Sequence, residues 1–289
     1  MEWAIDIGGT KVALCQPSGS SSQHFYFNSS ASLESDIVIV NQCLHAISAH
    51  CAEVSCVAIA SAPNISANGI VQQWPNRPHW QGFDLIAHVK NQLDCDVFVM
   101  DDGCAAALAE HQILDTPDSL HFTIGTGVGG GIFAARNLIK PAELGHFVVN
   151  NNGPQCSCGR YGCLQAYFSG RAFKSYLNAQ HISSSNFEDA KTVAPELIDD
   201  WYKKGVFALS QVVISLSEVF QPEVVTIGGG FASSIEHLVA DVVLLCSRLC
   251  RSGKMPPKIA LSAFPQNPSL QGAKTLLLDI STRKYALKF

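Results

Sequence analysis

The sequence predicts an α/β protein, because short strand-like runs alternate with segments of helical periodicity. Val54–Ala60 and Val97–Met100 are short apolar runs typical of buried strands. The segment between them carries apolar residues at helical spacing, on one face: Phe83, Ile86, Val89 and Leu93. Such alternation favours sheets covered by helices.

The elements on either side of these continue the alternation. Trp3–Asp6, Val12–Cys15 and Phe25–Phe27 read as short strands separated by Gly, Ser and Lys. Residues 33–50 predict a helix, because apolar side chains recur at helical spacing: Ile37, Val40, Leu44 and Ile47. Small residues in Gly103–Glu110 predict another helix.

A second unit is expected after the turn-rich segment Asp115–Asp118. It starts with a strand at Leu120–Ile124 and contains the clearest helical pattern of the chain: Leu209, Val212, Val213, Leu216, Val219 and Phe220. Pro222 ends that helix, and a strand at Val224–Ile227 and an apolar helix through Leu249 follow. We therefore expect a smaller lobe at 1–117, onto which the C-terminal tail can pack back, and a larger lobe at 118–289.

Composition narrows the class of protein. With 289 residues, of which 47% are hydrophobic, the chain can bury a large core. A net charge of −5 without a block of Lys or Arg disfavours nucleic-acid binding. No signal-like N-terminus and no run of about 18 apolar residues is visible, so we expect a cytoplasmic protein that does not enter membranes. The 11 cysteines are an odd number, which disfavours a disulfide framework.

The first glycine-rich turn, residues 6–11, follows a strand directly. Gly8 and Gly9 let the backbone turn sharply and present N–H groups to an anion, while Thr10 adds a hydroxyl and Lys11 a charge. Asp6 is placed to hold Mg²⁺ through water. An ordinary β-hairpin fits these residues equally well. The spacing excludes a P-loop.

The second glycine-rich turn is Gly125–Gly131, which matches Gly-x-Gly-x-x-Gly by spacing. A dinucleotide-binding fingerprint needs a helix immediately afterwards and an acidic residue about 20 positions on. Here the chain continues as a strand through Gly131–Ala134, and the next acidic residue is Glu143. The segment is therefore predicted to be a hairpin that cradles phosphate.

Four potential metal ligands follow: His146, Cys156, Cys158 and Cys163. One imidazole and three thiolates suit a closed tetrahedral Zn²⁺ site, and Gly159 and Gly162 supply the tight turns that it requires. A closed set of ligands leaves no position for a reacting water, so we expect a structural metal.

Two adjacent carboxylates, Asp101 and Asp102, come directly after the strand Val97–Met100. Carboxyl ends of sheet strands face the ligand crevice in α/β folds. Helix capping explains at least one of the two as well. Repulsion between neighbouring carboxylates would raise the pKa of one of them towards a range useful for proton transfer.

Taken together, these motifs resemble the ROK family (repressors, open reading frames and sugar kinases) of the actin-like ATPase superfamily. The resemblance rests on residues 6–11, Gly125–Gly131, residues 143–146 and the three clustered cysteines, and it covers nearly the whole chain. Length and the segment Val57–Ser61 are most similar to bacterial N-acetylmannosamine kinases. The resemblance implies a two-lobed, ribonuclease H-like fold with a cleft between the lobes.

It also implies an activity, namely transfer of the ATP γ-phosphoryl group to the 6-hydroxyl of a hexose, with Asp102 as the general base. Phosphates and Mg²⁺ would be held by Asp6, Gly8, Gly9, Thr10, Lys11, Thr126 and Gly127. Adenosine would lie against Gly228, Gly229 and Gly230. The sugar-binding positions would be Asn76, Asp101, Glu143, His146 and Gln165, with His146 serving both sugar and zinc. A homodimer is also implied.

Three departures from the family pattern concern the sugar. Asp101 stands where the family has Asn, Gln165 where it has Glu, and Ser61-Ala62-Pro63-Asn64 where it has Gly-x-Pro-Gly. Phosphoryl transfer is therefore a firmer expectation than the identity of the sugar. Two alternatives stand beside it: a glucokinase- or fructokinase-type enzyme, and a sugar-binding regulator without catalysis. A DNA-binding repressor is disfavoured, because the first phosphate loop already begins at residue 6.

Overall fold

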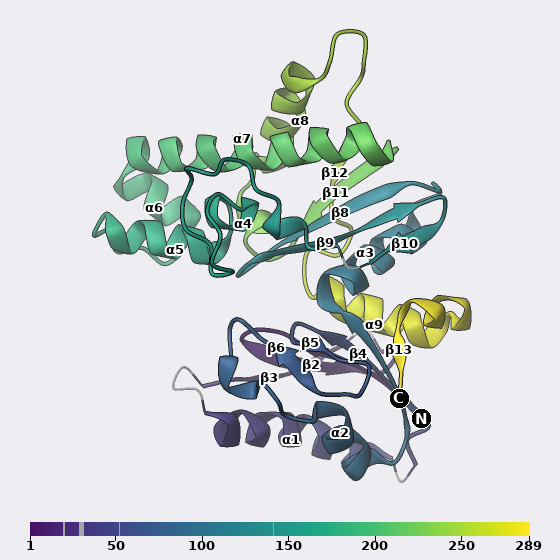
Figure 1. Ribbon diagram of the computed structural model, residues 1–289. Helices are drawn as coiled ribbons and strands as arrows, with labels where there is room; N and C mark the ends of the chain where they lie inside the picture. The colour runs from purple at the N-terminus through teal and green to yellow at the C-terminus, as the bar shows by residue number, and fades with distance from the viewer. Residues whose placement is uncertain (20, 29–31, 52, 141) are drawn as a thin grey trace. The chain divides into compact units, whose positions relative to one another are not determined.

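The computed structural model describes residues 1–289 except 20, 29–31, 52 and 141. The chain divides into two compact units (Figure 1). Unit 1 contains Met1–Ala109 together with Ser269–Phe289, and unit 2 contains Glu110–Pro268. The first boundary lies after residue 109, within a helix, rather than at the expected residue 117. The C-terminal residues pack back on unit 1, as expected, and add a strand to its sheet. None of the described helices has both the length and the apolar character needed to cross a membrane.

Unit 1 is built on a six-stranded sheet in the order β13-β7-β4-β1-β2-β3. Its strands are β1 Glu2–Ile7, β2 Lys11–Cys15, β3 Gln23–Tyr26, β4 Cys56–Ser61, β7 Asp96–Asp101 and β13 Leu287–Lys288, and a separate pair is formed by β5 Asn64–Ile65 and β6 Val71–Gln73. The helices are α1 Leu33–His50, η1 Pro78–Trp80, α2 Leu85–Leu93, α3 Asp102–Ile113 (which continues into unit 2), α9 Pro268–Leu278 and η4 Ile280–Tyr285.

Unit 2 is built on a five-stranded sheet in the order β10-β9-β8-β11-β12. The strands are β8 Ser119–Ile124, β9 Val128–Ala134, β10 Asn137–Ile139, β11 Val224–Gly228 and β12 Lys258–Leu261. The helices are η2 Leu144–His146, α4 Leu164–Tyr167, α5 Gly170–Ala179, α6 Phe187–Val193, α7 Pro195–Phe220, η3 Ala232–Ser234 and α8 Leu238–Leu249. Figure 1 shows the long helix α7 running along this sheet, and α8 packs against α7.

The two sheets share one strand plan. In unit 1, β1 and β2 form an antiparallel hairpin that β3 extends, and β4 and β7 add in parallel beside β1. In unit 2, β8, β9 and β10 form the antiparallel part, and β11 and β12 add in parallel beside β8. Each glycine-rich turn therefore joins the two strands of the equivalent hairpin. Duplication of one ancestral unit would produce such a shared plan.

A buried carboxylate organises unit 1. Asp36, on α1, is fully buried, and both of its oxygens lie within 2.8 Å of Arg77 Nη1. His79 Nε2 is 2.7 Å away, and Trp80 Nε1 donates at 2.9 Å. Burial acts to raise the pKa of Asp36, but the hydrogen bonds from Trp80, His79 and Arg77 together outweigh it and lower the pKa. The ion pair is therefore satisfied by hydrogen bonds, as a buried charge must be.

Asp36→Asn should lower the free energy of unfolding by about 3–5 kcal/mol, because the Arg77 guanidinium would remain buried without its counter-charge. Urea unfolding at neutral pH measures the change. Glu34→Gln, an exposed neighbour on the same helix, serves as the matched control and should cost less than about 1 kcal/mol. Equal losses for the two variants would contradict the role assigned to Asp36.

Candidate active site

The first glycine-rich turn joins β1 to β2. The Gly8 N–H donates to the Lys11 carbonyl at 3.0 Å, which closes the turn. The segment is therefore a β-hairpin, as one interpretation held, and a hairpin turn of this kind remains compatible with phosphate binding. A Cβ at Gly9 would lie only 2.4 Å from Nδ2 of Asn76. Glycine at position 9 thus allows the Asn76 amide to lie directly against the turn.

Arg77 braces the same turn. Its Nε donates to the Gly9 carbonyl at 3.3 Å, while its Nη1 is held by Asp36. The neighbouring residue Asn76 is thereby fixed beside the turn. No sequence pattern indicates this arrangement, because Asp36 and Arg77 lie 41 residues apart and each is usually a surface residue type.

Asp6, the last residue but one of β1, is buried. Burial raises the pKa of Asp6 to about 7, and the positive charge of Lys11 only partly opposes the shift. A Mg²⁺–nucleotide complex bound nearby would lower this pKa, and the carboxyl group would release its proton to solvent, because a nearby cation favours the charged form.

The raised pKa of Asp6 predicts a pH-dependent stability. Between about pH 4 and pH 7 the folded state holds a proton that the unfolded state has lost, so stability should fall as the pH rises through this window. A difference of about three pKa units corresponds to roughly 4 kcal/mol. Asp6→Asn should abolish this dependence, matching the wild type near pH 4 and exceeding it above pH 7. Urea unfolding of both proteins at several pH values, without nucleotide or Mg²⁺, tests this prediction. It would be refuted if the free energy of unfolding changed with pH in the same way for the wild type and for Asp6→Asn.

Asp101 and Asp102 lie where β7 meets α3. The parallel register aligns Ile7 of β1 with Ser61 of β4, and Ser61 with Asp101 of β7, so these three strands end at one edge of the sheet. Asp101 Oδ1 accepts a hydrogen bond from the Cys104 N–H at 2.9 Å. This confirms the capping role expected for one of the two acids. Asp102 is the half-buried first residue of α3.

The second glycine-rich turn, in unit 2, joins β8 to β9. The N-terminus of α5 supports it: Gly170 N–H donates to the Gly125 carbonyl at 2.8 Å, and Arg171 N–H to the Thr126 carbonyl at 3.1 Å. Gly229 has a φ of +91°, and a Cβ there would lie 2.6 Å from the Ile124 carbonyl oxygen. The structure therefore brings the Gly228–Gly230 turn directly against the end of β8.

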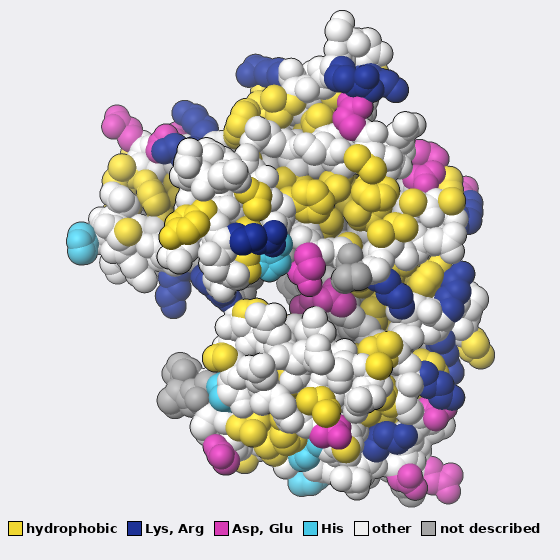
Figure 2. Space-filling view, in the orientation of Figure 1, with side chains coloured by type: hydrophobic (Ala, Val, Ile, Leu, Met, Phe, Trp, Pro, Cys, Tyr) yellow, Lys and Arg dark blue, Asp and Glu magenta, His cyan; other side chains and the backbone are white. Residues whose placement is uncertain are grey.

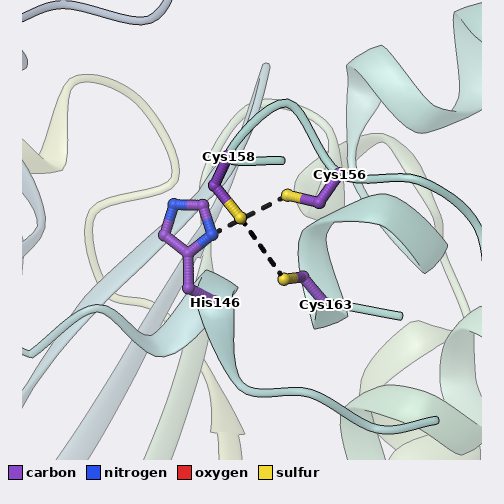
Figure 3. Close-up of side chains that lie close together, drawn as sticks. All are labelled: His146, Cys156, Cys158 and Cys163. Atoms are coloured by element: carbon purple, nitrogen blue, oxygen red, sulfur yellow. Dashed lines mark hydrogen bonds between the residues drawn. The ribbon is translucent and has the colours of Figure 1, made fainter. Parts of the chain in front are cut away.

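His146, Cys156, Cys158 and Cys163 come together in unit 2 (Figure 3). All four candidate ligand atoms lie within 4.8 Å of one another. His146 Nδ1 is 3.7 Å from Cys156 Sγ, and Cys158 Sγ is 3.7 Å from Cys163 Sγ. Two thiolates bound tetrahedrally to one Zn²⁺ at about 2.3 Å would lie about 3.8 Å apart. The spacing therefore fits a tetrahedral zinc site.

The chemistry of the cluster fits a metal as well. Burial acts to raise the pKa of Cys158, but hydrogen bonds from the backbone and side chain of Arg160 outweigh it and, with those of Cys156 and Cys163, lower the pKa to about 6. A thiolate is the form that binds Zn²⁺. The ring of His146 turns Nδ1 towards the sulfurs (Figure 3), so Nε2 lies on its opposite side.

Gln165, on α4, connects the cluster to the second turn. Its Nε2 lies 3.2 Å from Cys156 Sγ, and its Oε1 lies 3.5 Å from the Val128 N–H at the start of β9. Glu143 precedes η2, and its carbonyl accepts from the His146 N–H at 2.9 Å. His146 thus belongs to the cluster, Gln165 contacts its Cys156, and Glu143 meets His146 through the backbone. Asn76, Asp101 and Asp102 belong to unit 1.

A cavity of about 410 Å³ adjoins the second turn within unit 2. Thr126, Gly127, Cys156 and Gln165 line it, and so do side chains that the sequence analysis did not single out: Arg171, Tyr176, Trp201 and Lys204. These come from α5 and α7, whose periodicity marks their buried faces but not the faces that line a cavity. In Figure 2, Lys and Arg side chains are dispersed over the visible face, in keeping with the absence of a basic block in the sequence.

Comparisons with known proteins agree with the motifs. A profile of the ROK family matches residues 2–280. A kanosamine kinase from Amycolatopsis mediterranei is 32% identical over 94% of both chains, and an N-acetylmannosamine kinase from Escherichia coli O157:H7 is 28% identical over 82% of this chain and 88% of its own.

Solved structures show the fold. A ROK family glucokinase from Streptomyces griseus, in complex with glucose and AMPPNP, superposes with a TM-score of 0.80 at 23% identity, covering 95% of this chain and 98% of its own. A ROK hexokinase from Thermus thermophilus gives 0.76 at 21% identity, over 96% and 98%. The predicted actin-like α/β fold is confirmed. On the motifs, the profile and the relatives together, the chain belongs to the ROK family.

Proposed function

We propose that this chain transfers the γ-phosphoryl group of ATP to the 6-hydroxyl of a hexose-type sugar. It is a phosphotransferase of the ROK family, whose relatives compared above are sugar kinases. The observation that carries the proposal is the pairing of motifs: each unit has a glycine-rich turn on an equivalent hairpin, and an acid stands at the head of α3. Phosphoryl transfer needs little more than such positioning and charge stabilisation.

The residues divide by role. The first turn, Asp6 and the second turn would hold the phosphates and Mg²⁺, and Gly228–Gly230 would lie against adenosine. Asp102 would accept the proton of the attacking hydroxyl. Mg²⁺ would neutralise the charge that develops on the transferred phosphoryl group. Asn76, Asp101, Glu143, His146 and Gln165 would bind the sugar.

The cluster of His146 and three cysteines would hold one structural Zn²⁺. Because Nδ1 of His146 faces the sulfurs, Nε2 would be left to donate its hydrogen to a sugar hydroxyl. A histidine that binds metal through Nδ1 keeps its hydrogen on Nε2, so its tautomer is fixed. This suits a second role for His146 in binding the sugar. The resemblance further supports a cytoplasmic homodimer.

Three kinds of sugar have support. The resemblance favours N-acetyl-D-mannosamine, converted to its 6-phosphate in the breakdown of sialic acids, and N-acetylmannosamine kinases are among the relatives. The kanosamine kinase points instead to an aminohexose. A glucokinase- or fructokinase-type preference is an alternative, supported by a glucokinase from Thermotoga maritima that is 33% identical over 64% of this chain. A regulator without catalysis is the other alternative.

A coupled assay of ATP consumption tests the proposal. The purified protein is given Mg²⁺–ATP and a panel of neutral hexoses, N-acetylhexosamines and aminohexoses. The position of the phosphate group on the sugar product is then determined by NMR. Phosphorylation of the 6-hydroxyl of at least one sugar is expected. ATP consumption that no sugar stimulates, with sugar binding retained, would support the regulator instead.

A further inference from the structure

We propose that Glu110 and Ser262 are positioning residues for nucleotide binding, because together they support the backbone of the Gly228–Gly230 turn. This inference rests on the proposed function, in which that turn lies against adenosine. It adds a buried acid and a buried hydroxyl that belong to none of the motifs described above. All of these residues lie within unit 2.

Ser262 packs directly on the turn. It is buried and follows the last residue of β12. Its N–H donates to the Ile227 carbonyl at 2.9 Å, which extends the parallel pairing of β11 with β12 by one residue. A Cβ at Gly228 would lie 2.8 Å from Ser262 Oγ. The Ser262 side chain therefore lies against the backbone of Gly228, where β11 ends and the turn begins.

A buried carboxyl group holds the Ser262 side chain in place. Glu110, on α3, is 2% exposed, and its Oε1 accepts a hydrogen bond from the Ser262 hydroxyl. The Phe264 N–H lies 3.3 Å from the same Oε1 and 3.0 Å from Ser262 Oγ. Burial raises the pKa of Glu110, and hydrogen bonds from Ser262, Phe264 and Ala263 only partly oppose the shift. Because a buried polar group costs free energy unless it is hydrogen-bonded, Glu110 and Ser262 fix one another's side chains.

The end of β8 holds the turn on its other side. The Phe231 N–H donates to the Ile124 carbonyl at 3.1 Å, and Gly229 packs on the same carbonyl. Since β11 lies between β8 and β12 in the sheet, the turn is held from both sides. Its three glycines have no side chains of their own to anchor it. A misplacement of about 1 Å can cost about 10²-fold in rate, so loss of the Ser262 support should weaken the binding of a ligand on the turn.

The test measures ADP binding by calorimetry in the presence of Mg²⁺, beside thermal unfolding of the same samples. Ser262→Ala removes only the hydroxyl oxygen, and Glu110→Met removes the acceptor while it keeps an unbranched side chain. Each should raise the dissociation constant of ADP about tenfold, the effect of one lost hydrogen bond. Because the two residues act through one contact, the double variant should also lose about tenfold, whereas independent sites would lose about a hundredfold.

Ser119→Ala is the matched control in the same sheet. Ser119 is also buried, and its hydroxyl lies 2.8 Å from His111 Nδ1. It stands at the start of β8, however, and pairs with the start of β11, at the opposite end from the turn. This variant should bind ADP as the wild type does. With Ser262→Ala, KM for ATP should rise, while KM for the sugar at saturating ATP should stay that of the wild type.

The outcomes separate positioning from stability. Variants of Glu110 and Ser262 that melt earlier but bind ADP with wild-type affinity would overturn the inference, since the contact would then serve the fold alone. Additive losses in the double variant would overturn it as well. If Glu110→Met does not fold, Ser262→Ala decides by itself, because it removes a single atom. A wild type that binds no ADP would instead overturn the proposed function.

Discussion

Asp102→Asn should lower kcat by about 10²- to 10⁴-fold, the range in which a positioned general base contributes. The asparagine side chain has the size of aspartate but accepts no proton, so the hydroxyl would have to attack without proton removal. The first turn of α3 should be kept, because Asp101 rather than Asp102 caps it. Steady-state kinetics with the preferred sugar measure the loss.

Two controls separate chemistry from binding and folding. ATP affinity and the melting temperature of Asp102→Asn should match the wild type, since the phosphate-binding turns are untouched. Asp94→Asn, at the exposed end of α2, should keep full activity. An Asp102→Asn variant with the wild-type kcat would show that another group accepts the proton.

Periodicity and motif spacing predicted the elements that lie close together in sequence. The helix at 33–50 and the strands β1, β2 and β4 were predicted within two residues of their ends. The strand expected at Phe25–Phe27 is found at Gln23–Tyr26, because pairing with β2 rather than local propensity fixes its register. The helix α7 begins at Pro195, well before the apolar pattern that revealed it. The first turns of α7 are amphipathic, but their many polar residues do not form an apolar pattern strong enough to predict a helix.

Contacts between distant segments were out of reach of the sequence. The two-residue strand β13 has no local signal, so the pairing with β7 by which the C-terminal tail joins the sheet of unit 1 could not be located from the sequence. Asp36 lies four residues before Val40, on the buried face of α1, but nothing near it in the sequence reveals its partners at 77, 79 and 80. The grouping of His146, Cys156, Cys158 and Cys163 could be predicted, since the three cysteines lie within eight residues and thiolates with an imidazole are a specific ligand set. The lining of the cavity by Arg171 and Lys204 could not, because surface cations carry no such pattern.

Cys163→Ser should cost several kcal/mol of the roughly 5–15 kcal/mol that stabilises a typical domain. Cys163 is buried and joins the cluster to the start of α4. A serine hydroxyl is a poor ligand for Zn²⁺, and metal that binds only the folded state contributes its binding free energy to folding. The segment from His146 to Cys163 should lose its order together with the metal.

The measurements are metal content and thermal unfolding on the same samples. The wild type should contain about one Zn²⁺ per chain, as a single four-ligand site requires, and Cys163→Ser should contain much less. Stripping the wild type with a strong chelator should lower its melting temperature to near that of Cys163→Ser and lower its activity with it, because Gln165 and His146 lie at the cluster. Cys250→Ser, a half-buried cysteine of unit 2 outside the cluster, should retain zinc and stability. A zinc-free protein with wild-type stability and activity would mean that the three thiols and the imidazole merely pack against one another.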